Sequence, residues 1–192
     1  MTDPGSWTVE KHSEEKNIDL ILITHEHGDH IHVESLKKII ENNPNVVVIT
    51  NKGVGKLLDG AGIIYEILED KTVKDFFGIE IEAYDYAHAE IFRDIFKVEN
   101  TGFFIGERLF YPGDSFYNPG KTVEILALPV AGPWANVKDS INYALEIKPK
   151  ICFPVHDGML KQFGANHKIP SLVLEKEGII FKNFEEKNEE EF

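Results

Sequence analysis

Half of the chain's eight histidines lie within one nine-residue segment, Thr24–His32, which reads THEHGDHIH. The segment begins where residues 18–24 end, and that short apolar run of β-forming residues is typical of a strand buried on both faces. In α/β sheets, ligand sites form at the carboxyl ends of such strands. Imidazole and carboxylate groups are good zinc ligands and also suit iron or manganese. We therefore expect a metal site at the end of this strand.

The spacing inside the segment directs its side chains toward two points. His25 and His27 are two residues apart, so in extended backbone their rings project to the same side. Gly28 then allows the chain to turn, which lets Asp29 and His30 face a second point close to the first. The segment alone can thus supply ligands at two neighbouring positions.

Strand-like and helix-like segments alternate along the chain, and no repeat or linker divides it. We expect strands at residues 18–24, 46–50, 71–77, 79–86, 102–105, 109–111, 123–128, 151–155 and 178–181, and helices at 33–42, 52–59, 137–147 and 169–176. Helices lie between buried strands at both ends, with antiparallel strands in the middle. Two packed sheets covered by helices satisfy this order, although periodicity alone also allows a three-layer α/β fold.

The composition is that of a single acidic domain, for which we expect a small-molecule partner. Asp and Glu number 33 against 20 Lys and Arg, giving a formal charge of −13, which disfavours nucleic acid and membrane surfaces as partners. No apolar run approaches the ~20 residues of a spanning helix. The start, Met-Thr-Asp-Pro-Gly, lacks signal-peptide features, and the lone Cys152 can form no internal disulfide. We expect one cytoplasmic domain over residues 1–192, with 185–192 as a disordered acidic tail.

The pattern H-x-H-x-D-H, formed by His25, His27, Asp29 and His30, resembles the signature of the metallo-β-lactamase fold superfamily. The resemblance extends along the chain. Three further positions of the family pattern are matched by residues that each follow a strand-like run: His88, Asp114 in Pro112-Gly113-Asp114, and His156.

This resemblance implies a four-layer αββα sandwich with two divalent metal ions, zinc foremost and manganese or iron as alternatives. His25, His27 and His88 would hold one ion, Asp29, His30 and His156 the other, and Asp114 would bridge them. A hydroxide shared by the two ions would attack the substrate, and Asp29 would be the catalytic residue that orients it and accepts or returns its proton.

The back half resembles the branch of metal-dependent hydrolases related to L-ascorbate-6-phosphate lactonase. Residues 128–132, Lys148-Pro149-Lys150 and residues 153–156 carry that resemblance. The implied reaction is hydrolysis of a small ester, lactone or phosphoester. A phosphodiesterase or ribonuclease of the same fold, an iron-dependent redox or oxygen-using enzyme, and a metal-binding protein without enzymatic activity are the alternatives.

The family's strands before Asp3-Pro4-Gly5 are represented here only by Met1-Thr2, so the first sheet is expected to lack its N-terminal strands. An incomplete sheet exposes unpaired backbone groups along its edge. We therefore expect a homodimer or larger assembly that uses this sheet.

A few residues outside the ligand set also carry expectations. Arg93 and Trp134 are candidates for substrate contact, with Arg93 gripping an anionic group. Asp3 is a candidate hydrogen-bond partner of a ligand histidine. The remaining histidines, His12, His32 and His167, are interpreted as surface residues, with His32 the best candidate for a contact near the site, and Cys152 as a small core residue.

Overall fold

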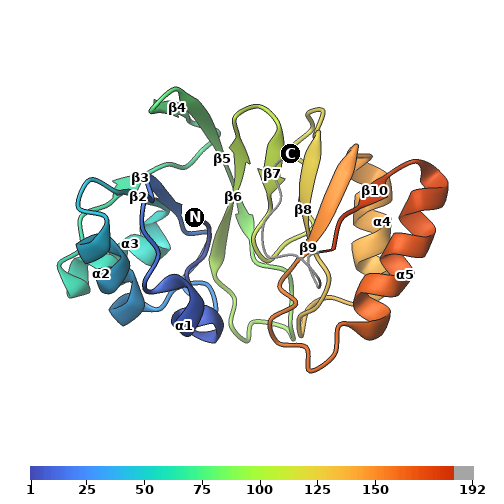
Figure 1. Ribbon diagram of the computed structural model, residues 1–192, viewed down its shortest axis with the longest axis horizontal. Coiled ribbons are helices and arrows are strands. Elements are labelled where there is room, and N and C mark those ends of the chain that lie inside the picture. Colours follow the sequence, from blue (N-terminus) through green and yellow to red (C-terminus); the bar gives the residue numbers. More distant parts are fainter. Residues whose placement is uncertain (184–192) are drawn as a thin grey trace.

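The computed structural model describes residues 1–183, which form two stacked sheets (Figure 1). The smaller sheet has the strand order β1-β2-β3, with β1 at Leu20–Leu22, β2 at Val47–Thr50 and β3 at Glu66–Ile67. Both pairings are parallel, as expected for short apolar strands that are connected through helices.

The larger sheet has the order β10-β9-β8-β7-β6-β5-β4. Its strands are β4 (Val73–Phe76), β5 (Ile79–Ala87), β6 (Glu99–Ile105), β7 (Leu109–Tyr111), β8 (Ile125–Pro129), β9 (Ile151–Val155) and β10 (Ile180–Phe181). Strands β4 to β7 pair antiparallel through hairpins, whereas β7 to β10 pair parallel. Strands β5, β7, β8 and β9 therefore run in the same direction, and their carboxyl ends meet at one edge of the sheet.

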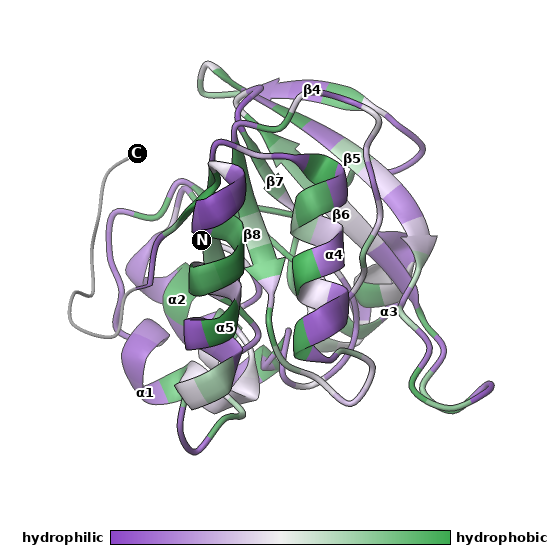
Figure 2. Ribbon diagram, turned by 90° about the vertical axis from the view of Figure 1, so that its right-hand side faces the viewer, coloured by the Kyte–Doolittle hydropathy of each residue, from purple (hydrophilic) through white to green (hydrophobic). Residues whose placement is uncertain are grey.

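Helices cover the outer face of each sheet, which gives the four-layer αββα arrangement (Figure 1). The helices α2 (Val33–Asn42) and α3 (Lys52–Ala61) lie on the side of the smaller sheet, and α4 (Val137–Ile147) and α5 (Gly164–Leu174) on the side of the larger one. Figure 2 shows α4 and α5 in front of the larger sheet. The expected fold class, mixed α/β with sheets flanked by helices, is confirmed.

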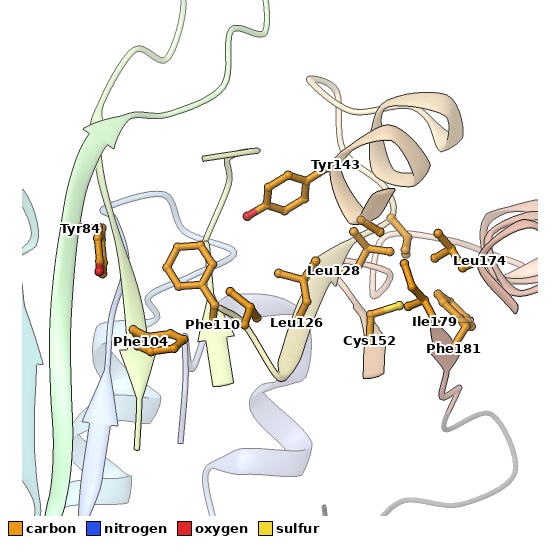
Figure 3. Close-up of a cluster of buried hydrophobic side chains, with 13 residues drawn as sticks. Tyr84, Phe104, Phe110, Leu126, Leu128, Tyr143, Cys152, Leu174, Ile179 and Phe181 are labelled. Atoms are coloured by element: carbon orange, nitrogen blue, oxygen red, sulfur yellow. The ribbon is translucent and has the colours of Figure 1, made fainter. Parts of the chain in front are cut away.

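Alternation along the strands sorts the core into three layers. Ile21 packs with α2 and α3, whereas its neighbour Leu22 packs with Phe103 of the larger sheet. On that sheet Phe104 faces the other way, toward the layer under α4 and α5 (Figure 3). Cys152 is fully buried in this last layer, and burial raises the pKa of its thiol to about 12, so its expected role as a core residue is confirmed.

Some element boundaries differ from those expected. Helix α5 begins at Gly164 rather than at residue 169 and contains Pro170, and the short strand β3 was not anticipated. The N-terminal turns η1 (Ser6–Thr8) and α1 (Val9–His12) and the turn η2 (Glu175–Glu177) were also not anticipated. The expected acidic tail at 185–192 lies outside the described residues. Within residues 1–183, the helices are too short or too polar to cross a bilayer.

The first residues of the chain lie along β1. Thr2 forms a parallel bridge to Leu22, and the N-terminal amine of Met1 donates to the Leu20 carbonyl at 2.8 Å. The amide of Asp3 continues this pattern by donating to the Leu22 carbonyl. This pairing carries Asp3 to the end of β1, where the histidine-rich segment starts.

Candidate metal centre

The seven candidate ligands follow the carboxyl ends of four strands. The Thr24–His32 segment connects β1 to α2, His88 comes directly after β5, Asp114 lies three residues after β7, and His156 directly follows β9. Because β5, β7 and β9 run in the same direction, their ends deliver these three side chains to one edge. The end of β1 brings the histidine-rich segment to the same place.

The first group combines His25, His27, His88 and Asp114, whose potential ligand atoms lie within 4.8 Å of one another. His25 Nε2 lies 3.1 Å from His27 Nδ1, and His88 Nε2 lies 3.1 Å from Asp114 Oδ2. This is the set of three histidines that the resemblance assigned to one ion, together with the carboxylate assigned as the bridge.

The second group combines Asp29, His30 and His156, again with ligand atoms within 4.8 Å. His156 Nε2 lies 3.4 Å from Asp29 Oδ2. Asp114 joins this group to the first, because its Oδ2 is 3.2 Å from His156 Nε2 and its Oδ1 is 3.1 Å from His30 Nε2. All seven side chains named from the sequence are thus brought together.

Five buried donor and acceptor atoms in the cluster form no well-aligned hydrogen bond among the described residues. They are His27 Nε2, His30 Nε2, Asp114 Oδ1 and both ring nitrogens of His156, and three of them do so although His30 Nε2 is 3.1 Å from Asp114 Oδ1 and His156 Nε2 is 3.2 Å from Asp114 Oδ2. Buried polar atoms without a well-formed hydrogen bond are rare in folded proteins, so five in one place need an explanation. Divalent cations would satisfy them, and the imidazole and carboxylate donor set suits zinc, iron or manganese. The residues therefore fit a metal centre.

The two groups differ in their protonation. Burial lowers the pKa of His25 well below its ordinary value, and it also lowers that of His27. In the second group burial acts in the same direction but is outweighed by carboxylates: Asp3 and Asp114 raise the pKa of His30 to about 10, and Asp114 and Asp29 raise that of His156 to about 9. Histidines must be neutral to bind a metal, so loading of the second group is coupled to proton release.

The two carboxylates of the cluster are held in their ionised form. Burial alone would raise the pKa of Asp114, but the His156, His30 and His88 rings beside it lower that pKa well below its usual range. Burial also opposes ionisation of Asp29, and again His156 and His30 outweigh it and lower the pKa.

Asp3 holds the histidine-rich segment in place through hydrogen bonds to Thr24 and a contact with His30. Its Oδ2 lies 2.7 Å from His30 Nδ1 and accepts from the hydroxyls of Thr24 (2.8 Å) and Tyr111 (3.0 Å), while its Oδ1 accepts from the Thr24 amide at 2.8 Å. The expected contact between Asp3 and a ligand histidine is confirmed. The turn behind Asp3 also needs a glycine, because a Cβ on Gly5 would lie 1.7 Å from the carbonyl oxygen of Asp29.

Two supports of the dispersed ligands were missed by sequence reasoning. Asn100, fully buried in β6, accepts from the Asp114 amide and donates to the Pro112 carbonyl, both at 2.9 Å. The indole of Trp134 donates to Asp114 Oδ2 at 2.8 Å. The only sequence sign of Asn100 is a polar residue at the start of an apolar strand, and Trp134 was noted only as a substrate contact.

Two of the remaining histidines contradict the surface interpretation. His12 is 8% exposed and its ring is hydrogen-bonded to Thr8 Oγ1 (3.0 Å) and Ser35 Oγ (2.8 Å), which ties α1 to α2. His167 is 3% exposed, and its Nε2 lies 2.9 Å from Asp157 Oδ2, beside the candidate ligand His156. The third, His32, is partly buried and caps α2, where its Nδ1 accepts from the Ser35 amide.

A cavity of about 280 Å³ lies against the cluster. It is lined by cluster residues and by Gly28, Ile91, Phe96, Pro133 and Trp134. Trp134 therefore lines a cavity at the cluster, and its contact with a substrate stays a prediction. Arg93 is exposed on the loop between Ile91 and Phe96, with its guanidinium carbon 5.0 Å from the centre of the Phe92 ring, and it does not line this cavity.

Two stacked sheets between helices, with clustered histidines and aspartates at the shared ends of their strands, define an αββα fold built around a metal-binding edge. Comparison with known families agrees: the family described as "Beta-lactamase superfamily domain" matches residues 1–156. The chain belongs to this family.

Named relatives and solved structures are consistent with that assignment. The chain is 28% identical over 167 residues to protein Rv0786c of Mycobacterium tuberculosis, covering 83% of this chain and 76% of that protein. It is also 28% identical over 153 residues to the UPF0173 metal-dependent hydrolase Ta0764 of Thermoplasma acidophilum, covering 74% and 67% of the two chains. The fold is similar to that of a candidate metal-dependent hydrolase from Parabacteroides distasonis (TM-score 0.74, 23% identity, 95% and 82% covered).

Proposed function

We propose that this protein is a metal-dependent hydrolase of a small ester, lactone or phosphoester. The observation that carries the proposal is the cluster itself, in which two groups of histidine and aspartate ligand atoms share Asp114 and include five buried atoms without a well-aligned hydrogen bond. The name of the Thermoplasma relative, a metal-dependent hydrolase, supports the same class of reaction. The resemblance to the branch related to L-ascorbate-6-phosphate lactonase supports an ester or lactone.

The proposed cofactor is a pair of divalent ions, zinc foremost, held by His25, His27 and His88 on one side, by Asp29, His30 and His156 on the other, and by Asp114 between them. Such a pair supplies a nucleophilic water-derived oxygen at neutral pH and polarises the substrate oxygen. Residues of the chain would supply proton transfer and contacts with the substrate.

Asp29 is the proposed proton acceptor. Its neighbours keep it ionised, and it lines the cavity at the cluster, so its carboxylate can take a proton from an attacking water and return it to the leaving oxygen. Trp134 fixes Asp114 through its indole and presents its ring to the same cavity. Arg93, on the exposed loop between β5 and β6, is the candidate to bind an anionic group in a part of the substrate that lies outside the cavity.

Replacing a shared ligand tests the proposal most directly. Asp114→Ala should lower the content of both ions and abolish hydrolysis, because it withdraws a donor from both groups. Metal analysis by mass spectrometry on protein purified without added metal, followed by assays with lactones, carboxylic esters and phosphodiesters, gives the readout. Asp59→Ala, which removes an exposed carboxylate on α3, is the matched control and should keep metal and activity.

The same measurements separate the alternatives. Two ions with ester or lactone turnover support the proposal. Full metal content and turnover in Asp114→Ala would contradict the bridging role. Turnover of phosphodiesters alone would favour the nuclease-type alternative, and iron with oxygen consumption would favour the redox alternative.

A further inference from the structure

The 280 Å³ cavity beside the cluster is lined by two chemically different sets of residues. One set consists of cluster residues, namely His27, Asp29, His88, Asp114 and His156. The other set, which we call the apolar wall, consists of apolar side chains from two loops. Ile91 and Phe96 come from the loop between β5 and β6, and Pro133 and Trp134 from the loop between β8 and α4.

Phe96 is the most exposed part of the apolar wall. Its side chain is 69% exposed, yet its ring lies edge-on to the His27 ring with centroids 6.0 Å apart. An exposed phenyl ring that lines a cavity leaves apolar surface for a ligand to cover.

The apolar wall provides no positive charge. Lysine and arginine are absent from the residues that line the cavity. The one indole donor on this wall, Trp134 Nε1, already donates to Asp114. A charged group packed against Phe96 and Trp134 would give up part of its hydration without gaining an ion pair from this wall, which is costly.

The size of the cavity limits what can enter. A cavity of about 150 Å³ lined by apolar side chains accommodates benzene. The 280 Å³ found here therefore has room for one ring or a short alkyl chain beside the reacting group.

We infer, on the basis of the proposed hydrolase function, that the substrate is a carboxylic ester or lactone whose apolar, uncharged substituent packs against Phe96 and Trp134. In its hydrolysis a water oxygen bonds to the carbonyl carbon, the bond from that carbon to the alcohol oxygen breaks, and one water proton passes to that oxygen. An ester gives a carboxylic acid and an alcohol, a lactone gives one hydroxy acid, and no oxidant or reductant takes part.

Two series of uncharged esters test this inference with the metal-loaded full chain. One series is lengthened in the acyl part and the other in the alcohol part, and each includes a member of equal length that ends in a carboxylate. Burying one methylene changes an equilibrium about fourfold, so kcat/KM should rise about fourfold per methylene in at least one series until the cavity is full. The carboxylate-ended member of that series should lose this gain.

Variants of the loop locate the effect. Phe96→Ala should reduce the preference for long over short chains about tenfold, mainly through KM, whereas Phe96→Leu should restore most of it. Phe92→Ala makes the same change on the same loop at a side chain that does not line the cavity, and it should keep the preference. All three variants should retain the metal content of the parent protein.

The possible outcomes are distinct. Ester hydrolysis without any rise along either series, or a preference for the carboxylate-ended members, would overturn the inference and leave the hydrolase proposal intact. Equal loss in Phe92→Ala and Phe96→Ala would also overturn it. Turnover of phosphodiesters but of neither ester series would overturn the assignment of the substrate to the carboxylic esters and lactones. Lack of any hydrolysis by metal-loaded protein would remove the proposed function itself, and the inference with it.

Discussion

The candidate ligands reach the cluster by two different routes. Four of them, His25, His27, Asp29 and His30, belong to one short segment that serves both metal groups, whereas His88, Asp114 and His156 arrive separately from three strand ends. The continuous segment rests on shared supports: Asp3 contacts Thr24 and His30, and Pro4 accepts from the His32 amide. Each dispersed ligand has its own support, such as Asn100 for Asp114.

This difference determines whether the substitution of a supporting residue weakens metal binding in one group or in both. A support of the continuous segment influences both groups at once, because the segment contributes ligands to each. A support of His88 or His156 acts mainly on the group in which that ligand lies, whereas Asn100 supports Asp114, which both groups share. Three substitutions distinguish these cases.

Asp3→Ala should have the largest effect. It leaves the Thr24 amide and hydroxyl, the Tyr111 hydroxyl and His30 Nδ1 without their acceptor, and each buried unpaired group costs about 1 kcal/mol or more. The free energy of unfolding should fall by about 3 kcal/mol in chemical denaturation, and both ions should bind more weakly in a metal titration. Asp59→Ala serves as control. Weakening of only one ion would show that the segment is not a single unit.

His167→Ala should have a smaller and one-sided effect. His167 Nε2 contacts Asp157, and the adjacent His156 has a φ of 61°, so this contact holds a strained stretch of backbone. Because His167 contacts Asp157, the chain neighbour of His156, its effect should lie at the lower end of the about 10–100-fold weakening that follows loss of a ligand's own hydrogen-bond partner. We expect the ion of the second group to weaken about tenfold and the first to stay unchanged, as followed by titration with isothermal calorimetry. Equal weakening of both ions would contradict the separate supports.

His12→Ala should leave the metal centre unaffected. This buried histidine links Thr8 and Ser35, neither of which is a candidate ligand, so its removal should lower the free energy of unfolding by about 1–2 kcal/mol without changing metal affinity. It is the matched control for His167→Ala, because both remove a buried imidazole. Thermal and chemical unfolding together with metal titration give the comparison. A change in metal affinity would extend the site's support to α1.

The same comparison explains what could be predicted from the sequence. The continuous segment was found directly, because four of its ligands lie within six residues after an apolar strand. The three dispersed ligands depended on resemblance to a family, since spacing along the chain does not say which strand ends meet. The residues that support the dispersed ligands could not be predicted from the sequence, because Asn100 and His167 are polar residues whose burial follows from the packing of distant elements.

Element boundaries failed for a related reason. The buried face of α5 is made by His167, Pro170 and Leu174, which is not an apolar helical pattern, so the first residues of this helix were not recognised. Strand β6 begins at Glu99, three residues earlier than expected, because Asn100 and Thr101 are polar and yet buried. Polar residues that are buried in contacts with distant elements thus obscured the local pattern.

The distances along the chain between the clustered residues have a thermodynamic consequence. A single cysteine allows no disulfide within the chain. Metal ions bound by candidate ligands between His25 and His156 would instead cross-link residues that are far apart in the sequence. Closing a loop removes conformations mainly from the unfolded chain, and a ligand that binds only the folded state adds stability with its concentration. Melting temperature should then depend on free metal concentration, and a chelator would act on this protein as reduction acts on a disulfide-bonded one.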